Sequence, residues 1–473
     1  MSVSPRWWAL TAVLALGCAS AQQPTMATAQ AQPRQQPPAN PNDVWASTYQ
    51  PLPSHTTLIR NATVLTAAGP RIEGGSVLLR DGKIAAVGRD IQAPADATVI
   101  DGTGKWVTPG LIDDHSHLGV YAAPGGQALS DGNEATNPNT ADVWAEHSVW
   151  PQDPQFALAL AGGVTTIQIL PGSANLFGGR TVVVKNVPAR TVQAMKFPGA
   201  PWGLKMACGE NPKRVYENRG PSTRMGNTAG YREAFIQAQE YRDRMQRWRE
   251  EGADPAKRPT RNLKLETLAG ALDGDILVHW HCYRADDMAN AMAVAREFGF
   301  HIATFEHAVE AYKIPDLLKQ AGVCANMWAD WWGFKQEAYD GIQQNAAIVN
   351  AAGACAIIHS DDANGIQRLN QETGKAIASG RRLGIDVPYE DAIQWTTINP
   401  ATALGIGDRT GSLVQGKMAD VVLWTGDPFS VYSHAEKVFI DGALVYDRDD
   451  PSHQPVSDFL VGNEPSQGEG RQP

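Results

Sequence analysis

Two histidines close to the end of an apolar run form the first candidate metal site in this chain. The run Val107 to Ile112 leads through two aspartates to His115 and His117. Residues i and i+2 of an extended strand point to the same side, so both imidazoles can face one point. A histidine pair of this kind is also common on solvated strand faces. The pair therefore predicts a metal site only if the rest of the chain supplies more ligands.

Further polar groups close other apolar runs along the chain. One run ends in His279 and His281, a second in His307, and a third in Asp361. Each histidine taken alone is more often a hydrogen-bonded core residue. Several separate strand ends that each carry a histidine or an aspartate are hard to obtain by chance, and together they indicate a metal centre.

A lysine inside an apolar run adds to this pattern. Lys205 lies in the run 203–207, where an ammonium group is costly unless it is paired or chemically altered. Reaction with CO2 would convert this lysine into a carbamate, a carboxylate-like ligand able to bridge two metal ions. We therefore count Lys205 among the candidate metal ligands.

Length and charge limit the class of protein. The 473 residues exceed one ordinary domain and suffice for a barrel of about 250 residues with accessory parts. The chain has 40 Lys and Arg against 50 Asp and Glu, a net charge of −10. This balance argues against a nucleic-acid binder or a protein of anionic membranes, and favours a soluble enzyme or binding protein.

The N-terminus has the pattern of an export signal. Arg6 precedes the apolar stretch Trp7 to Leu16, and Ala19-Ser20-Ala21 fits a signal-peptidase site, which predicts a signal peptide over 1–21. The competing interpretation is a lipobox at 14–18 that leaves a lipid on Cys18, and this would be the chain's one membrane attachment. Residues 22–54 are rich in Gln, Pro and Ala and predict a disordered linker. We expect a periplasmic or extracellular protein.

The remaining cysteines do not form a recognisable disulfide pattern. Each lies in or beside an apolar run, so we expect them to be small buried hydrophobic residues. The four are Cys208, Cys282, Cys324 and Cys355.

Short β-rich runs lie on both sides of the long central segment, in 55–108 and again in 409–447. Neither set could bury its apolar face alone, so we expect one discontinuous β-sandwich built from both. A polar C-terminal tail over 448–473 follows it. The charged stretch Tyr231 to Glu251 predicts a solvated helix.

The segment 109–408 alternates apolar β-like runs with helical patterns, which predicts βα units around a parallel sheet. About eight strands over this length indicate an α/β protein with a (β/α)8 TIM-like barrel inserted into the sandwich. The third run could instead be a loop hairpin. The strand candidates are 111–115, 164–170, 181–185, 203–207, 276–281, 301–305, 322–327 and 354–360.

These motifs together resemble the metal-dependent amidohydrolase superfamily. The resemblance rests on the order His-x-His, Lys, His, His, Asp. It also rests on three stretches: Pro109 to His117, Asn399-Pro-Ala to Gly405, and Gly411-Ser-Leu to Asp420. It extends from about Thr57 to Tyr446 and is closest to the imidazolonepropionase-like and Xaa-Pro-dipeptidase-like members. The motifs are specific for the superfamily and much less so for a substrate.

The resemblance implies two divalent metal ions. Zinc is the default, and Mn2+, Fe2+ or Co2+ also fit such ligands. The implied ligands are His115, His117, Lys205 as a carbamate formed with CO2, His279, His307 and Asp361. Strand register favours His279 over His281 as the ligand, which leaves His281 for the substrate. Glu210 or, less favourably, Lys185 could bridge the metals in place of Lys205.

The implied reaction is hydrolysis of an amide-type C–N bond in a dipeptide-like or cyclic amide. A hydroxide that bridges the metals would attack the carbonyl, and Asp361 would act as general base and then as acid. A mononuclear deaminase of the same fold and a non-catalytic binding protein are the alternatives. We expect a homo-oligomer.

Substrate recognition is expected in the loops. Arg180, in the Gly-rich stretch 172–180, and Tyr216 and Arg224 could bind an anionic substrate group. The aromatic run 327–334 could form a pocket wall, and core packing explains it nearly as well.

Overall fold

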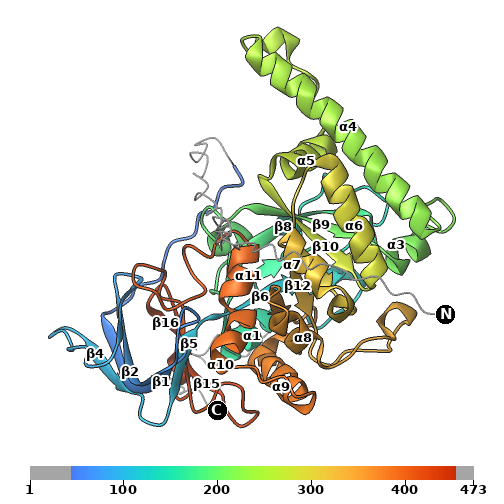
Figure 1. Cartoon of the computed structure of the whole chain (residues 1–473). Helices are drawn as coiled ribbons and strands as arrows, with labels where there is room; N and C mark the ends of the chain where they lie inside the picture. The colour runs from blue at the N-terminus through green and yellow to red at the C-terminus, as the bar shows by residue number, and fades with distance from the viewer. Residues whose placement is uncertain (1–43, 454–473) are drawn as a thin grey trace, which may run out of the picture. The chain divides into compact units, whose positions relative to one another are not determined.

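A computed structural model of the protein describes residues 44–453 (Figure 1). The predicted signal peptide, the candidate lipid site at Cys18 and most of the linker lie outside the described residues, as does the tail from 454. The described end of the linker contacts the folded body, since Tyr49 is buried and its hydroxyl donates to Asp441 Oδ2 at 2.5 Å. This part of the predicted linker is therefore ordered. Within 44–453 no helix is both long and apolar enough to cross a membrane.

One eight-stranded sheet combines strands from both ends of the chain, as predicted. Its order is β16-β15-β14-β5-β1-β2-β3, and β4 pairs with β1. The strands are β1 (Thr57–Val64), β2 (Ile72–Arg80), β3 (Lys83–Gly88), β4 (Thr98–Asp101), β5 (Trp106–Pro109), β14 (Val421–Trp424), β15 (Ala435–Ile440) and β16 (Ala443–Asp447). Strand β5 joins the two halves because it pairs with β1 on one side and with β14 on the other.

A second sheet of eight strands forms the barrel, and all eight predicted runs are strands. The strands follow in chain order and are β6 (Leu111–Ser116), β7 (Val164–Ile169), β8 (Phe177–Lys185), β9 (Trp202–Ala207), β10 (Ile276–Cys282), β11 (Ile302–His307), β12 (Cys324–Met327) and β13 (Ala356–Ile358). Strand β8 runs antiparallel to both neighbours. The loop 170–176 is too short for the crossover that a parallel partner would need, so β7 and β8 form a hairpin.

The barrel nearly closes where β13 returns to β6. The amide of Asp361 donates to the carbonyl oxygen of His115 at 3.0 Å. The amide of Ser360 donates to Asp113 Oδ1 at 3.2 Å. Because these contacts join the ends of the first and last strands, Asp361 lies beside the histidine pair.

Helices cover the barrel sheet (Figure 1). They are α1 (Pro154–Ala161), α2 (Val192–Met195), α3 (Glu210–Val215), α4 (Arg224–Glu250), α5 (Leu263–Asp273), α6 (Ala285–Phe298), α7 (Pro315–Ala321), α8 (Asn345–Ala351), α9 (Leu369–Arg382), α10 (Tyr389–Ala392) and α11 (Ile398–Ala403). The charge pattern predicted a solvated helix, but helix α4 is buried along part of its length. It buries Phe235 against Phe177 and Phe300, while its far end projects away from the barrel.

The structure corrects the expectation for the cysteines. Cys208 pairs with Cys282 and Cys324 pairs with Cys355 as disulfides. Each bond joins neighbouring barrel strands at their ends, β9 to β10 in the first case and β12 to β13 in the second. Sequence spacing could not show these pairs, because they depend on which strands lie side by side.

Candidate metal centre

Imidazole and carboxylate side chains meet at the carboxyl ends of β6, β11 and β13. Asp361 Oδ1 lies 3.3 Å from His115 Nε2 and 3.2 Å from His117 Nε2. Asp361 Oδ2 lies 3.9 Å from His307 Nδ1. A further imidazole, that of His359, has its ring centre 5.0 Å from those of both His115 and His307. The structure thus brings together four of the predicted ligands and one that the sequence interpretation missed.

These side chains form two overlapping groups of three donors. His115, His307 and His359 make one group, and His115, His117 and Asp361 make the other. The ligand atoms within each group lie within 4.8 Å of one another. Both groups are buried or half-buried and share His115, so their geometry is compatible with one metal ion or with two adjacent ions.

Unsatisfied nitrogen atoms show that the cluster fits a metal. Among the residues that the structure describes, both ring nitrogens of His359 and Nδ1 of His307 are buried without a hydrogen-bond partner. An unpaired buried polar atom costs about 1–3 kcal/mol, so native proteins rarely leave several together. Coordination of a divalent cation would satisfy one ring nitrogen of each of these two histidines.

The backbone is unusual at two of the ligand positions. His307 has φ of 73° and Asp361 has φ of 61°, in the left-handed region that non-glycine residues seldom adopt. Each such residue costs about 1–3 kcal/mol, and these residues cluster at functional sites. At His307 this conformation breaks the strand alternation, so that Glu306 and His307 both face the barrel interior.

Glu306 is a second residue that the sequence interpretation missed. Its Oε2 accepts from His115 Nδ1 at 2.7 Å and from Asn326 Nδ2 at 2.6 Å, and its Oε1 accepts from Thr304. A carboxylate behind a ligand histidine fixes the tautomer and turns the other ring nitrogen toward the metal. His117 is oriented in the same way by the carbonyl of Leu170, 2.8 Å from its Nδ1. Its position next to His307 in the sequence was the one signal that could have identified Glu306.

Protonation favours metal binding in this cluster. Burial alone would raise the pKa of Asp361, but His307 and the neighbouring imidazoles of His115 and His117 outweigh it and hold that pKa well below its usual value. Burial also holds the pKa of His307 well below its usual value. Asp361 is therefore an anion and His307 a neutral imidazole at neutral pH, which are the forms that bind metals.

Lys205 lies beside this cluster. It is almost completely buried, and its Nζ donates to His115 Nε2 at 3.0 Å. Burial lowers the pKa of Lys205 to about 8. The structure therefore places the preferred bridging candidate next to a predicted ligand.

Neither His279 nor His281 belongs to the two donor groups. His279 lies one layer deeper, with Nδ1 2.8 Å from Thr304 Oγ1 and Nε2 3.1 Å from Gln168 Nε2. His281 borders the pocket, and its ring centre is 4.5 Å from that of His307. Both side chains point inward, and depth along the strand decides that His281 and not His279 borders the pocket.

The other bridging candidates lie elsewhere. Glu210 begins α3 and is absent from the donor groups and from the pocket lining. Lys185 is buried between Asp420 Oδ1 at 3.0 Å and Asp441 Oδ2 at 2.8 Å. It therefore joins β8 to the sheet of the chain ends and does not reach the cluster.

The three predicted substrate-binding residues also lie away from the pocket lining. Arg180 donates to Thr267 and packs on Trp144 at 4.4 Å. The hydroxyl of Tyr216 is buried and bonds to Asn137 and Asn175. These residues stabilise loop packing, as does Arg224, which is described below.

A pocket of about 300 Å3 opens above the metal donors. Besides His115, His117, His307 and Asp361, it is lined by Ser173, Asn211, Arg214, His281, Tyr283, Phe334 and Lys335. Phe334 belongs to the aromatic run that was predicted as a possible pocket wall. Arg214 and Lys335 were missed because the short helix α3 and the loop that carries Lys335 show no periodic pattern.

Comparison with known proteins agrees with this architecture. The sequence signature of the amidohydrolase family matches residues 266–446. The crystal structure of an amidohydrolase from Thermotoga maritima MSB8 is 37% identical with a TM-score of 0.76, and the match covers 83% of this chain and all of that one. This chain therefore belongs to the amidohydrolase superfamily, as its motifs predicted.

Two curated relatives extend this result. Amidohydrolase tasK of Hapsidospora irregularis is 32% identical over 454 residues, which cover 88% of this chain and 46% of that protein. The chain thus spans about half the length of that relative. The imidazolonepropionase of Thermoplasma volcanium is 24% identical over 410 residues, which cover 80% of this chain and 92% of that protein.

Proposed function

We propose that this protein is a metal-dependent hydrolase that cleaves an amide-type C–N bond in a dipeptide-like or cyclic amide. The single observation that carries the proposal is the position of Asp361, within 3.3 Å of both His115 and His117 at the base of a pocket. His115, His117, His307, His359 and Asp361 would hold the metal, with zinc the default ion. When bound, the metal would acidify a water molecule and polarise the substrate carbonyl.

The residues of the chain would handle the proton. Asp361 is ionised and borders the pocket, so it can accept a proton from the attacking water and return it to the leaving amine. Burial and the nearby Lys335 hold the pKa of His281 well below its usual value, and it is therefore a neutral imidazole. It lines the pocket with its Nε2 3.5 Å from Asn211 Nδ2, so it can orient a polar group of the substrate.

Lys205 supports a second metal ion in this proposal. Carbamylation requires the neutral amine, and a pKa of about 8 leaves a usable fraction of that form near neutral pH. As a carbamate, Lys205 would supply a carboxylate-like ligand next to His115. One feature favours the alternative, a mononuclear deaminase: both donor groups share His115, so one ion could use either of them.

The test combines metal analysis with a substrate screen. Wild-type protein is compared with Asp361→Asn, His359→Ala and Lys205→Ala, and Glu210→Ala serves as a control outside the cluster. We expect metal in the wild type, loss of turnover on chelation, and a loss of about 10²-fold or more in kcat for Asp361→Asn. Lys205→Ala should lose one of two ions. Full turnover of chelated protein, or of Asp361→Asn, would overturn the proposal.

A deaminase and an amide hydrolase differ in two measurements. A single ion per chain that Lys205→Ala retains, with ammonia released from an aminated heterocycle, would favour the deaminase. Two ions, with cleavage of dipeptides or cyclic amides, would favour the hydrolase.

We also propose that the protein acts after export, at the periplasmic or extracellular side. Disulfides persist in oxidising compartments, and the pairs Cys208–Cys282 and Cys324–Cys355 support this location. Cell fractionation of the full chain, together with thiol alkylation before and after reduction, tests it. Recovery in the cytoplasm with the thiols of Cys208, Cys282, Cys324 and Cys355 reactive before reduction would contradict it.

A further inference from the structure

The pocket above the metal donors carries two cations although the chain as a whole is acidic. Lys335 and Arg214 line it, and Asp361 is the one carboxylate among its described lining residues. The net charge of the chain is −10, so composition does not explain the presence of two cations among these lining residues. Positive charge in a confined pocket attracts anionic ligands.

The ammonium group of Lys335 does not use all of its N–H donors in hydrogen bonds with the described residues. Its Nζ donates to Asn211 Oδ1 at 3.1 Å, while the carboxylates of Glu337 and Glu210 lie at 3.7 and 4.0 Å. An ammonium group has three N–H donors, and among the described residues the hydrogen bonds account for one of them. Because both carboxylates lie beyond hydrogen-bond distance, a ligand carboxylate in the pocket could approach Nζ more closely than they do.

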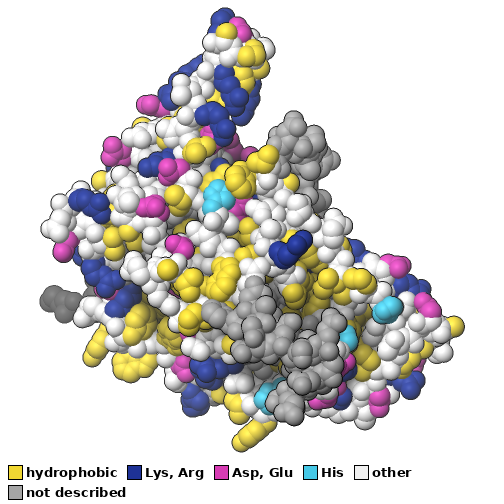
Figure 2. Space-filling model, turned by 180° about the vertical axis from the view of Figure 1, so that it is seen from behind, with side chains coloured by type: hydrophobic (Ala, Val, Ile, Leu, Met, Phe, Trp, Pro, Cys, Tyr) yellow, Lys and Arg dark blue, Asp and Glu magenta, His cyan; other side chains and the backbone are white. Residues whose placement is uncertain are grey.

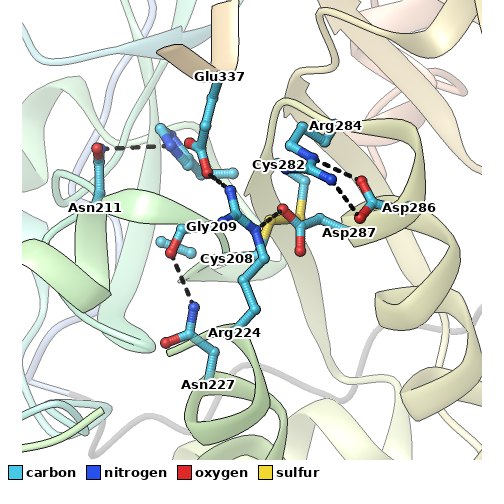
Figure 3. The surroundings of a disulfide bond; sticks show 12 residues. Cys208, Gly209, Asn211, Arg224, Asn227, Cys282, Arg284, Asp286, Asp287 and Glu337 are labelled. Atoms are coloured by element: carbon cyan, nitrogen blue, oxygen red, sulfur yellow. Dashed lines mark hydrogen bonds and ion pairs between the residues drawn. A yellow bond between two sulfur atoms is a disulfide. The ribbon is translucent and has the colours of Figure 1, made fainter. Parts of the chain in front are cut away.

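The loop that carries Lys335 is held in place by its neighbour Glu337. The Oε1 atom of Glu337 accepts from the amide of Glu210 at 2.6 Å and from the guanidinium of Arg224. Arg224 in turn donates to Asp287 Oδ2 at 2.9 Å, and Figure 3 shows Glu337, Arg224 and Asp287 in this order. The contacts join the loop to the starts of α3, α4 and α6, so Lys335 is positioned before a ligand arrives, which reduces the entropic cost of binding.

Tyr283 relates Lys335 to the metal donors. The lysine Nζ lies 3.7 Å from the centre of the Tyr283 ring, and that ring centre lies 5.1 Å from His307 and 4.9 Å from His281. One aromatic ring therefore separates the ammonium from the reacting region. This spacing suits a substrate whose anionic group lies a few atoms from its scissile amide.

We infer that Lys335 determines specificity by binding a carboxylate of the substrate. Arg214 adds a second positive charge at the pocket, and Phe334 and Tyr283 contact the apolar part of the same molecule. The substrate class is then an amide with a free carboxylate, such as a dipeptide or an N-acyl amino acid. This inference rests on the proposed function and replaces Arg180, Tyr216 and Arg224 in the role that the sequence suggested for them.

The test uses matched acids and carboxamides on metal-loaded protein. The pairs are Ala-Phe, N-acetylphenylalanine and the cyclic amide 5-oxoproline, each compared with its carboxamide. We expect kcat/KM of the wild type to favour the acid by at least tenfold, Lys335→Met to abolish this preference, and Lys335→Arg to restore part of it. Lys264→Met is the matched control, because Lys264 lies on α5 outside the pocket lining and contacts Asp142 at 3.9 Å.

A binding measurement separates this inference from the proposed function. Calorimetry of N-acetylphenylalanine and its carboxamide on metal-free protein should show tighter binding of the acid, and Lys335→Met should remove the difference. A wild type that cleaves none of the amides, yet binds the acid through Lys335, would refute the amide-hydrolase proposal alone. A wild-type preference for acids that Lys335→Met leaves unchanged in both measurements would refute the role of Lys335. Thermal unfolding and metal content of each variant establish that it is folded.

Discussion

His115 and Glu306 form a hydrogen-bonded pair at the centre of the barrel, with His115 Nδ1 2.7 Å from Glu306 Oε2 and neither side chain exposed. Glu306 comes from β11 and His115 from β6, so the pair lies across the barrel interior. Because Nδ1 is occupied, Nε2 of His115 is directed to the metal donors. Glu306 therefore determines the ring orientation of His115, the histidine that both donor groups share.

Replacement of this carboxylate should weaken metal binding. We expect Glu306→Gln to reduce metal affinity about 10- to 100-fold, since the neutral amide orients His115 less firmly and makes it less basic. Competition with a chelator measures the affinity. Glu297→Gln, which removes an exposed carboxylate paired with Arg232, is the control and should leave it unchanged. Wild-type affinity in Glu306→Gln would contradict this role.

Gly209 should be essential for the placement of the Lys335 loop. A Cβ atom at this position would lie 2.3 Å from Glu337 Oε1, and the residue has φ of 75°. We expect Gly209→Ala to displace Glu337 and thereby to reduce the preference for acidic substrates. Gly299→Ala is a close control, because Gly299 has the same φ with no neighbouring atom within 4 Å of its Cβ position. Equal effects of both variants on substrate preference would count against the argument.

Lys185 should stabilise the fold without a part in metal binding. It is fully buried between Asp420 and Asp441, and Lys185→Met would leave two buried carboxylates without their cation. Loss of one partner from a buried ion pair costs about 3–5 kcal/mol, whereas an exposed pair such as Lys313 with Asp340 contributes less than about 1 kcal/mol. Chemical denaturation of Lys185→Met and Lys313→Met measures the difference. Metal content per folded chain should stay at the wild-type value in both.

Tyr216 should affect stability in alkaline solution and leave activity intact. Burial raises the pKa of Tyr216 to about 12, so the folded state holds its proton between the ordinary value of 10.0 and about 12 while the unfolded state releases it. The free energy of unfolding therefore falls with rising pH in this window. We expect the stability advantage of the wild type over Tyr216→Phe to be complete below pH 10 and to shrink toward pH 12. An advantage that stays constant with pH would contradict this.

Local pattern was sufficient to predict the strands and most of the metal donors. Side chains two residues apart on a strand share a side, so His115 and His117 were recognisable as a pair. The carboxyl ends of barrel strands gather at one edge, which brought His307 and Asp361 into the same prediction. The amidohydrolase family motifs are likewise contiguous in sequence and could be recognised directly.

Other features depended on contacts between residues far apart in the chain. Depth along β10 decided that His281 and not His279 borders the pocket, and strand adjacency decided the disulfide pairs. Lys185 and Lys205 both lie in apolar strands, and only their tertiary contacts distinguish them. Lys185 forms ion pairs with Asp420 and Asp441. Lys205 lies beside His115.

The sequence by itself determined the class of the protein, the positions of the barrel strands and a candidate metal centre that begins at His115, because periodicity and spacing act over a few residues. The tertiary structure decided the membership of His359 and the support from Glu306, since both depend on register across the barrel. It also decided the place of Lys335, which lies in a loop without periodicity and is positioned by Glu337 and Arg224 from separate parts of the chain.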